Sequence, residues 1–223
     1  MTPDETLTPT DSADAAQLDA WLAALRLDAG APQRQRLLDY LALLQRWNRV
    51  YNLTAVRDPG QMLAKHLADC LALVAPLRAR APARLLDVGS GGGLPGLVLA
   101  ILLPETAVVL CDAVRKKCAF LQQAAATLGL RNVRVEHGRV ETLSLPAFDC
   151  ITSRAFSELA DMVRLIRHLL RPDGCWAAMK GVRPDAELAA LPADVHAEVQ
   201  ALTVPGLDAQ RCVVWLRPLD PKP

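Results

Sequence analysis

The stretch that decides the fold is residues 85–96, which read Leu-Leu-Asp-Val-Gly-Ser-Gly-Gly-Gly-Leu-Pro-Gly. A short apolar run leads into a glycine-rich turn, and an apolar helical pattern follows it. Glycine permits positive φ angles and lets the backbone approach a ligand closely, and a helix that begins behind such a turn offers free N–H groups. A strand, a glycine turn and a helix in this order predict a ligand site, although a tight turn without a ligand is the simpler alternative.

The glycine spacing fits two ligand classes. Gly89, Gly91 and Gly93 form G-x-G-x-G, which is typical of methyltransferases. Gly91, Gly93 and Gly96 form G-x-G-x-x-G, the pattern of dinucleotide-binding enzymes. The glycines alone therefore do not choose between a methyl donor and a dinucleotide.

Two carboxylates near the glycines favour the methyl donor. Asp87 precedes the turn, where a carboxylate would crowd a pyrophosphate but can take part in holding the cationic aminoacyl-sulfonium end of S-adenosylmethionine. Asp112 ends the next apolar run, where it can accept both ribose hydroxyls of an adenosine, in this donor or in NAD. We therefore expect S-adenosylmethionine as the cofactor and S-adenosylhomocysteine as the product.

Downstream of residue 84, short apolar runs alternate with helical patterns. The runs are residues 85–88, 108–111, 133–136, 149–152 and 175–179, and helices are expected to begin near Leu94, Val114, Glu158 and Asp185. This alternation predicts a parallel sheet covered on both faces. Residues 196–203 and 211–216 have no helix between them and predict an antiparallel hairpin. The expected fold is α/β, that of class I S-adenosylmethionine-dependent methyltransferases, with a Rossmann-like, mostly parallel sheet that ends in this hairpin.

The first 80 residues are expected to be helical. Leucine stripes in residues 18–25 and 37–44 predict two helices, separated by Gly30-Ala31-Pro32, and a third is expected from about residues 58–59 to Pro76. Trp47 and Tyr51, four apart, are interpreted as anchors that tie this segment to the sheet. The expected domains are a flexible acidic arm (1–14), a helical segment packed on the sheet domain (15–80), the methyltransferase domain (81–218) and a tail (219–223).

Composition restricts the class of protein. The chain is 52% hydrophobic, but no apolar run is long enough to span a bilayer, and the acidic N-terminus lacks the features of a signal peptide. The six cysteines form no C-x-x-C pair, which predicts free thiols and no metal site. We expect a cytoplasmic monomer that binds no membrane and no metal. Residues 1–30 carry six acids and one base, whereas the remainder carries 18 acids and 24 bases, a balance that permits a polyanionic partner without requiring one.

From about Leu18 to Leu216 the chain resembles the RsmG (GidB) family of bacterial 16S rRNA guanine-N7 methyltransferases. The markers, in chain order, are Trp-Asn-Arg-Val-Tyr-Asn-Leu-Thr (47–54), His-Leu-Ala-Asp (66–69), the glycine turn (87–96), Asp112 with Arg-Lys-Lys (115–117), Arg-Val-Glu (139–141), Ser-Arg-Ala-Phe (153–156) and Lys-Gly (180–181). Cys70 stands where the family usually has serine.

The resemblance implies both a cofactor site and a substrate. It implies that Gly89 and Leu94 line the donor site, that Val140 and Glu141 border the adenine, and that Arg154 lies at the cofactor. The implied substrate is one guanine in the decoding-region hairpin of 16S rRNA in the small ribosomal subunit.

Several side chains are candidates for contact with that RNA. Arg154 and Phe156 follow the fourth strand, where one can contact phosphate or base and the other can stack. For His66 and Asp69 we favour a histidine hydrogen-bonded beneath the cofactor over direct contact with substrate. The candidate RNA contacts are Arg115, Lys116, Lys117, Phe156 and Lys180, and the solvated face of a helix is an equal alternative for the first three.

The chemistry that the sequence lacks agrees with an N7 acceptor. Residues 152–156 are not the Asn/Asp-Pro-Pro-aromatic turn that accompanies amine methylation, and no Pro-Cys nucleophile occurs. Guanine N7 carries an available lone pair, so catalysis needs positioning, for which Arg154 is the candidate, rather than a general base. Two alternatives stay open: a small-molecule or protein methyltransferase on the same fold, and a dinucleotide-binding oxidoreductase.

Overall fold

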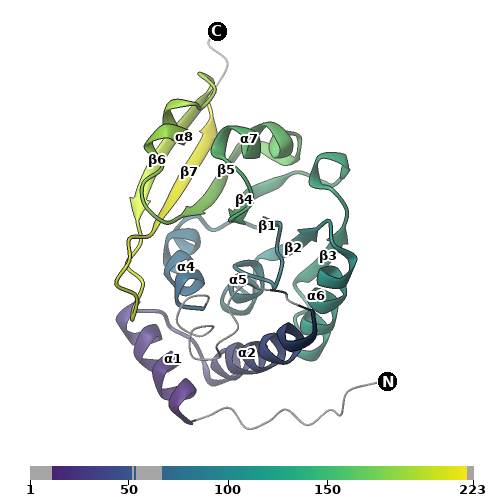
Figure 1. Ribbon diagram of the computed structural model, residues 1–223, viewed down its shortest axis with the longest axis vertical. Helices are drawn as coiled ribbons and strands as arrows, with labels where there is room; N and C mark the ends of the chain where they lie inside the picture. The colour runs from purple at the N-terminus through teal and green to yellow at the C-terminus, as the bar shows by residue number, and fades with distance from the viewer. Residues whose placement is uncertain (1–11, 52, 54–66, 220–223) are drawn as a thin grey trace.

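The computed structural model describes residues 12–51, 53 and 67–219, and its centre is one seven-stranded sheet. The strands are β1 (Arg84–Val88), β2 (Ala107–Asp112), β3 (Val133–His137), β4 (Phe148–Arg154), β5 (Leu170–Lys180), β6 (Val195–Ala201) and β7 (Cys212–Pro218). Their order across the sheet is β3-β2-β1-β4-β5-β7-β6 (Figure 1). Strands β1 to β5 pair in parallel, and β7 runs antiparallel to both β5 and β6. The predicted parallel sheet with a terminal antiparallel hairpin is confirmed.

Helices cover both faces of the sheet. One face carries α1 (Ser12–Ala24), α2 (Ala31–Tyr51), α4 (Ala68–Arg80), α5 (Gly96–Leu102) and α6 (Arg115–Thr127), whose buried residues share one core. The other face carries α7 (Leu159–Ile166) and α8 (Asp185–Ala189), with the short turns η2 (Val140–Thr142) and η3 (Arg167–Leu169) nearby. Within the described ranges, no helix is long and apolar enough to cross a membrane.

The central apolar runs form strands because they are buried on both faces. Side chains alternate across a strand, so Leu85 enters the core beneath α2, α4 and α5, while Leu86 enters the core beneath α7. Val108 and Val109 divide in the same way one strand further along. A strand with two apolar faces therefore fixes helices on either side of the sheet.

The largest differences from the expected element boundaries are in α4 and β5. The helix expected to end at Pro76 continues to Arg80, because Leu77 beyond the proline is fully buried and holds the last turn on the core. Strand β5 begins at Leu170 rather than at residue 175, since a register shift between Phe148 and Cys150 accommodates a stretch whose Pro and Gly predict a turn. The expected start of the third helix, near residues 58–59, lies outside the described residues.

The N-terminal helices pack directly on the sheet domain. The ring of Trp47 lies 5.5 Å from that of Phe120 in α6, at 59°, in agreement with its interpretation as an anchor. The side chain of Tyr51 lies outside the described part of the chain. Helix α1 begins at Ser12, so the last residues of the expected acidic arm are helical.

Candidate active site

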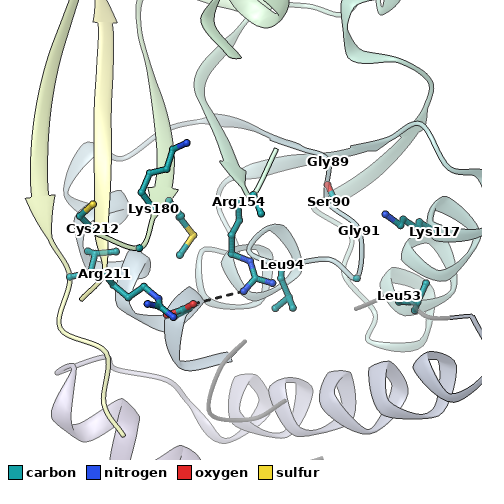
Figure 2. A pocket seen from close by; sticks show the side chains of 16 residues that line it. Leu53, Gly89, Ser90, Gly91, Leu94, Lys117, Arg154, Lys180, Arg211 and Cys212 are labelled. Atoms are coloured by element: carbon teal, nitrogen blue, oxygen red, sulfur yellow. Dashed lines mark hydrogen bonds and ion pairs between the residues drawn. The ribbon is translucent and has the colours of Figure 1, made fainter. Parts of the chain in front are cut away.

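A cavity of about 630 Å³ opens at the edge where the parallel strands end (Figure 2). The turn after β1, the ends of β4 and β5, and the start of β7 all contribute to it. The glycine turn and Lys117 lie at one end, Arg154 and Leu94 in the middle, and Arg211 at the other end. The carboxyl edge of the strands is where open α/β sheets bind ligands.

The glycine turn is fixed to the end of β2. The backbone amides of Gly89 and Ser90 both donate to the carbonyl oxygen of Cys111, at 2.9 and 3.1 Å. The amide of Gly91 donates to Oδ2 of Asp112 at 3.0 Å. Gly89 has a φ of 68°, and a Cβ there would lie 3.1 Å from the Phe156 ring, so glycine is required on both counts.

Helix α2 holds the same turn from the other side. The buried hydroxyl of Tyr40 donates to the carbonyl oxygen of Gly92 at 2.6 Å. Burial raises the pKa of Tyr40 well above its ordinary value, which keeps the hydroxyl protonated as a donor. Sequence reasoning missed this residue, because a tyrosine inside a leucine-rich helix gives no signal besides core packing.

Asp87 lies beneath the turn, fully buried, and does not line the cavity. Its Oδ2 accepts the amide of Gly96 at 3.1 Å, while its Oδ1 has no hydrogen-bond partner. Burial raises the pKa of this carboxyl to about 7. A Cβ on Gly96 would come within 2.6 Å of Oδ2 and would overlap Leu110, so only glycine lets the helix approach this closely.

Asp112 lies at the boundary between the turn and α6. Its Oδ1 accepts the amide of Val114 at 2.8 Å, and its Oδ2 accepts the amide of Gly91. The Nζ of Lys117 lies 3.8 Å from Oδ2 and lines the cavity in front of it. A carboxylate has about four acceptor positions, so these contacts leave capacity for a ligand hydroxyl.

Two arginines meet one buried carboxylate in the cavity wall. Arg211 Nε donates to Asp69 Oδ1 at 2.9 Å, and Arg154 Nη1 lies 3.9 Å from Asp69 Oδ2 (Figure 2). The side chain of Asp69 is only 8% exposed, and burial raises its pKa while both arginines oppose that rise. These groups come from β4, α4 and the start of β7, and 142 residues separate Asp69 from Arg211. Sequence reasoning singled out Arg154 and Asp69 but not Arg211.

Lys180 lines the cavity at the end of β5, but its ammonium group already has protein partners. Its Nζ bonds both carboxylate oxygens of Glu187, at 3.0 and 2.7 Å, and the carbonyl oxygen of Ser157 at 3.2 Å. Because Glu187 belongs to α8, this ion pair holds Lys180 on the face of the sheet that α7 and α8 cover.

The structure gathers part of the expected site into this cavity and leaves part outside it. The expected residues that line the cavity are Gly89, Gly91, Leu94, Lys117, Arg154 and Lys180. Those that lie outside the lining are Asp87, Gly93, Asp112, Arg115, Lys116, Val140, Glu141 and Phe156.

The residues outside the lining fall into distinct settings. Val140 is buried in η2, and Glu141 beside it pairs with Arg139 at 2.6 Å. Arg115 and Lys116 are exposed at the start of α6. Phe156 is half-buried beside Gly89 and packs on the core beneath α7. The expected His66 lies outside the described residues.

Among the described residues, thiols, histidines and carboxylates do not gather into a possible metal site. All six cysteines are free thiols there, and no three His, Cys, Asp or Glu side chains of that part lie together as possible metal ligands. Burial raises the pKa of Cys70, beside the cavity wall, to about 12, so this thiol stays protonated.

Comparison with known proteins gives consistent matches. The family model for rRNA small subunit methyltransferase G matches residues 33–214. A "Ribosomal RNA small subunit methyltransferase G" of Acidovorax sp. (strain JS42) is 58% identical over 208 residues, which cover 88% of this chain and 92% of that protein. One of the same name from Methylibium petroleiphilum (strain ATCC BAA-1232 / LMG 22953 / PM1) is 52% identical over 216 residues, which cover 95% and 98%.

Solved structures share the fold at low identity. The S-adenosylhomocysteine-bound methyltransferase PaMTH1 of Podospora anserina superposes with a TM-score of 0.58, covers 97% of this chain and 100% of its own, and is 16% identical. An O-methyltransferase from Bacillus cereus, also in complex with S-adenosylhomocysteine, gives a TM-score of 0.58 at 18% identity, over 90% of this chain and 97% of its own. At such identities the likeness shows the fold alone.

Proposed function

This chain belongs to the rRNA small subunit methyltransferase G family, and on that premise we propose that it methylates N7 of one guanine in the decoding-region hairpin of 16S rRNA. It is an S-adenosylmethionine-dependent methyltransferase, as its family shows. The observation that carries the proposal is the cavity itself. One end is a glycine turn suited to the donor, and the other end has charged side chains that can hold an acceptor.

The residues at the glycine end fit an adenosine-bearing, cationic methyl donor. The cavity of about 630 Å³ is within the range of small-molecule sites. Asp112 has acceptor capacity for ribose hydroxyls, and the partnerless Oδ1 of Asp87 is a buried oxygen that a nearby cation would stabilise. Gly89, Gly91 and Leu94 would form the wall against the donor. Gly93, Val140 and Glu141 would support it from outside the lining, the last two near the adenine.

The acceptor chemistry asks little of the protein besides orientation. When bound, S-adenosylmethionine supplies a methyl group on a positively charged sulfur. The N7 lone pair can bond to the methyl carbon while the carbon–sulfur bond breaks and S-adenosylhomocysteine leaves, without loss of a proton. Arg154 lies between the glycine turn and Arg211, where it can hold the base or its phosphate against the donor end. Met179 and Leu202 add apolar lining that excludes water from the same space. Correct alignment of two reactants is worth up to roughly 7–11 kcal/mol of the barrier.

Cations at the rim would hold the RNA outside the cavity. Arg115 and Lys116 are exposed at the start of α6, next to Lys117, and Lys180, which already pairs with Glu187, lies beside the acceptor end. Phe156 would pack under the glycine turn and stack with RNA only through its exposed part. The partner in this proposal is the small ribosomal subunit, and the enzyme acts on it in the cytoplasm as a monomer.

The test is transfer of a labelled methyl group to small ribosomal subunits that lack the modification. Nucleoside analysis of their 16S rRNA should show 7-methylguanosine at a single position. A different methylated nucleoside would overturn the assignment of the atom. No transfer to subunits or free rRNA, by protein that binds S-adenosylhomocysteine, would overturn the RNA substrate and favour a small-molecule or protein acceptor.

A further inference from the structure

The cavity lining contains one carboxylate among the described residues, that of Asp69. The other charged side chains of the lining are Lys117, Arg154, Lys180 and Arg211, all of them cations. A buried carboxylate at 8% exposure is costly unless its charge is used, either to hold neighbouring cations or to bind a ligand. The question is which of these two roles Asp69 has.

Its contacts leave acceptor capacity toward the cavity. The hydrogen bond from Arg211 Nε uses one acceptor position of Oδ1, and Arg154 Nη1 lies beyond hydrogen-bond distance of Oδ2, at 3.9 Å. Burial raises the pKa of this carboxyl, and the two arginines oppose that rise because their charges favour its anionic form. Asp69 is therefore a preorganised acceptor among the cationic side chains that line the cavity.

Its place in the cavity is the end remote from the nucleoside part of the donor. Asp112 and Lys117 mark the β2 side of the glycine turn, and Arg211 lies beyond Arg154 on the far side (Figure 2). Asp69 joins Arg154 to Arg211 and so belongs to this far side. Leu202 and Met179 line the cavity as well and offer apolar surface for a purine ring.

Guanine is the base that a carboxylate in this place recognises. Its Watson–Crick edge presents two adjacent donors, N1–H and N2–H₂, which match the two oxygens of a carboxylate. Adenine instead presents a lone pair at N1, which a carboxylate repels. Enzymes that act on an extruded base read its Watson–Crick edge by hydrogen bonds and hold its faces with apolar side chains.

We propose that Asp69 is the specificity-determining residue of the reaction, which accepts the N1–H and N2–H₂ of the target guanine and so directs N7, on another edge of the purine, toward the methyl donor. The proposal rests on the guanine-N7 function proposed above. The same contact favours the transition state, because positive charge that arrives on the purine strengthens both donors toward an anion. Arg154 and Arg211 then hold the carboxylate in place.

The test removes one hydrogen bond from each side. Small subunits are reconstituted with 16S rRNA that carries guanine or inosine at the target position, since inosine keeps N1–H and N7 but lacks the 2-amino group. Single-turnover methylation is measured for the parent enzyme and for Asp69→Asn and Asp69→Ala. A hydrogen bond to a charged group predicts that inosine slows the parent about 10- to 100-fold. In Asp69→Ala the inosine penalty should shrink to less than about threefold, with Asp69→Asn in between.

A purely structural role for Asp69 predicts a different pattern. If Asp69 only anchors Arg211 and Arg154, its variants slow guanine and inosine subunits by the same factor, and that result overturns the proposal. A parent enzyme that methylates both substrates equally fast overturns it as well. If the parent forms no 7-methylguanosine in guanine subunits, the proposed function fails first and this assignment fails with it. The affinity of both Asp69 variants for S-adenosylhomocysteine, measured directly, should stay within about threefold of that of the parent, because Asp69 lies at the end of the cavity remote from the glycine turn.

Asp149→Asn is the matched control. Asp149 is also a partly buried carboxylate that pairs with an arginine, Arg171, at 3.0 Å, and accepts a backbone amide, that of Arg84, at 2.7 Å. It lies near the start of β4, at the opposite edge of the sheet from the cavity. This variant should lose stability but keep the full inosine penalty of the parent.

Discussion

The hydroxyl of Tyr40 and the carbonyl oxygen of Gly92 form a 2.6 Å hydrogen bond across 52 residues of sequence. Tyr40 is fully buried in α2, and Gly92 is in the middle of the glycine turn. Helix α2 thus holds the glycine turn from one side, while the amides of Gly89 and Ser90 fix it to β2. The helical segment therefore supports the proposed donor site as well as covering the sheet.

Tyr40→Phe should therefore weaken both the fold and the donor site. The change leaves a buried carbonyl without its donor, which costs roughly 1–3 kcal/mol of unfolding free energy. Because the carbonyl belongs to the turn, affinity for S-adenosylhomocysteine should fall several-fold. Urea denaturation and calorimetry measure the two effects.

Thr106→Val provides the comparison for that variant. Thr106 is also buried, and its hydroxyl donates to the carbonyl oxygen of Pro82 at 3.0 Å, away from the cavity. It should lose similar stability and keep the parent affinity. Equal affinities in all three proteins would contradict a role for Tyr40 in the donor site.

A second prediction concerns the buried Asp87. Its pKa is about 7 in the fold and 3.8 for an ordinary aspartate, because burial disfavours the charged form more than the amide of Gly96 and the charge of Arg154 favour it. A carboxyl whose pKa is higher in the fold than in the unfolded chain stabilises the fold fully when the pH is below 3.8, its ordinary pKa. This contribution is lost as the pH rises through about 7, its pKa in the fold. The unfolding free energy of the ligand-free protein should fall between pH 5 and pH 8 relative to that of Asp87→Asn.

Denaturation of both proteins across that pH range is the measurement. The comparison with Asp87→Asn removes the titration of histidines and of the other carboxylates, which the two proteins share. Parallel curves would show that Asp87 does not titrate in this window.

The alternation of strands and helices could be predicted because the central apolar runs are buried on two faces, as Leu85 and Leu86 illustrate. The glycine turn and Asp112 could be placed at a common edge because parallel strands end together. The pairing of Asp69 with Arg211 could not be predicted. Asp69 belongs to the His-Leu-Ala-Asp marker, but Arg211 belongs to no pattern, and only the tertiary fold brings the two side chains to 2.9 Å. The start of β5 was missed because Pro and Gly in residues 170–174 predict a turn, and a bulge accommodates them instead.

A third prediction separates activity from stability at Arg154. Its ion pair with Asp69 is long, at 3.9 Å, and Asp69 keeps its hydrogen bond from Arg211, so Arg154→Ala should lower methyl transfer far more than it lowers the unfolding free energy. Loss of a positioning group should slow methyl transfer about 100-fold. Denaturation and single-turnover assays on one preparation test both statements.

Arg164→Ala is the control. It removes an exposed ion pair on α7 at 3.0 Å and should leave the rate unchanged. Full activity in a normally folded Arg154→Ala protein would remove Arg154 from the site.

The last prediction decides between the two interpretations of the basic residues at the start of α6. Arg115 and Lys116 are exposed, next to Lys117 at the cavity rim. If both contact phosphates, the double variant Arg115→Gln/Lys116→Gln should lower the slope of log affinity for subunits against log salt by about 1 to 2, because fewer counterions are released. The rate at saturating subunits should stay that of the parent, since neither residue lines the cavity.

Arg131→Gln is the control. Arg131 is exposed before β3, at the opposite edge of the sheet, and its variant should keep the slope of the parent. An unchanged slope in the double variant would show that these side chains form a solvated helix face, and that the RNA is held by other cations of the rim.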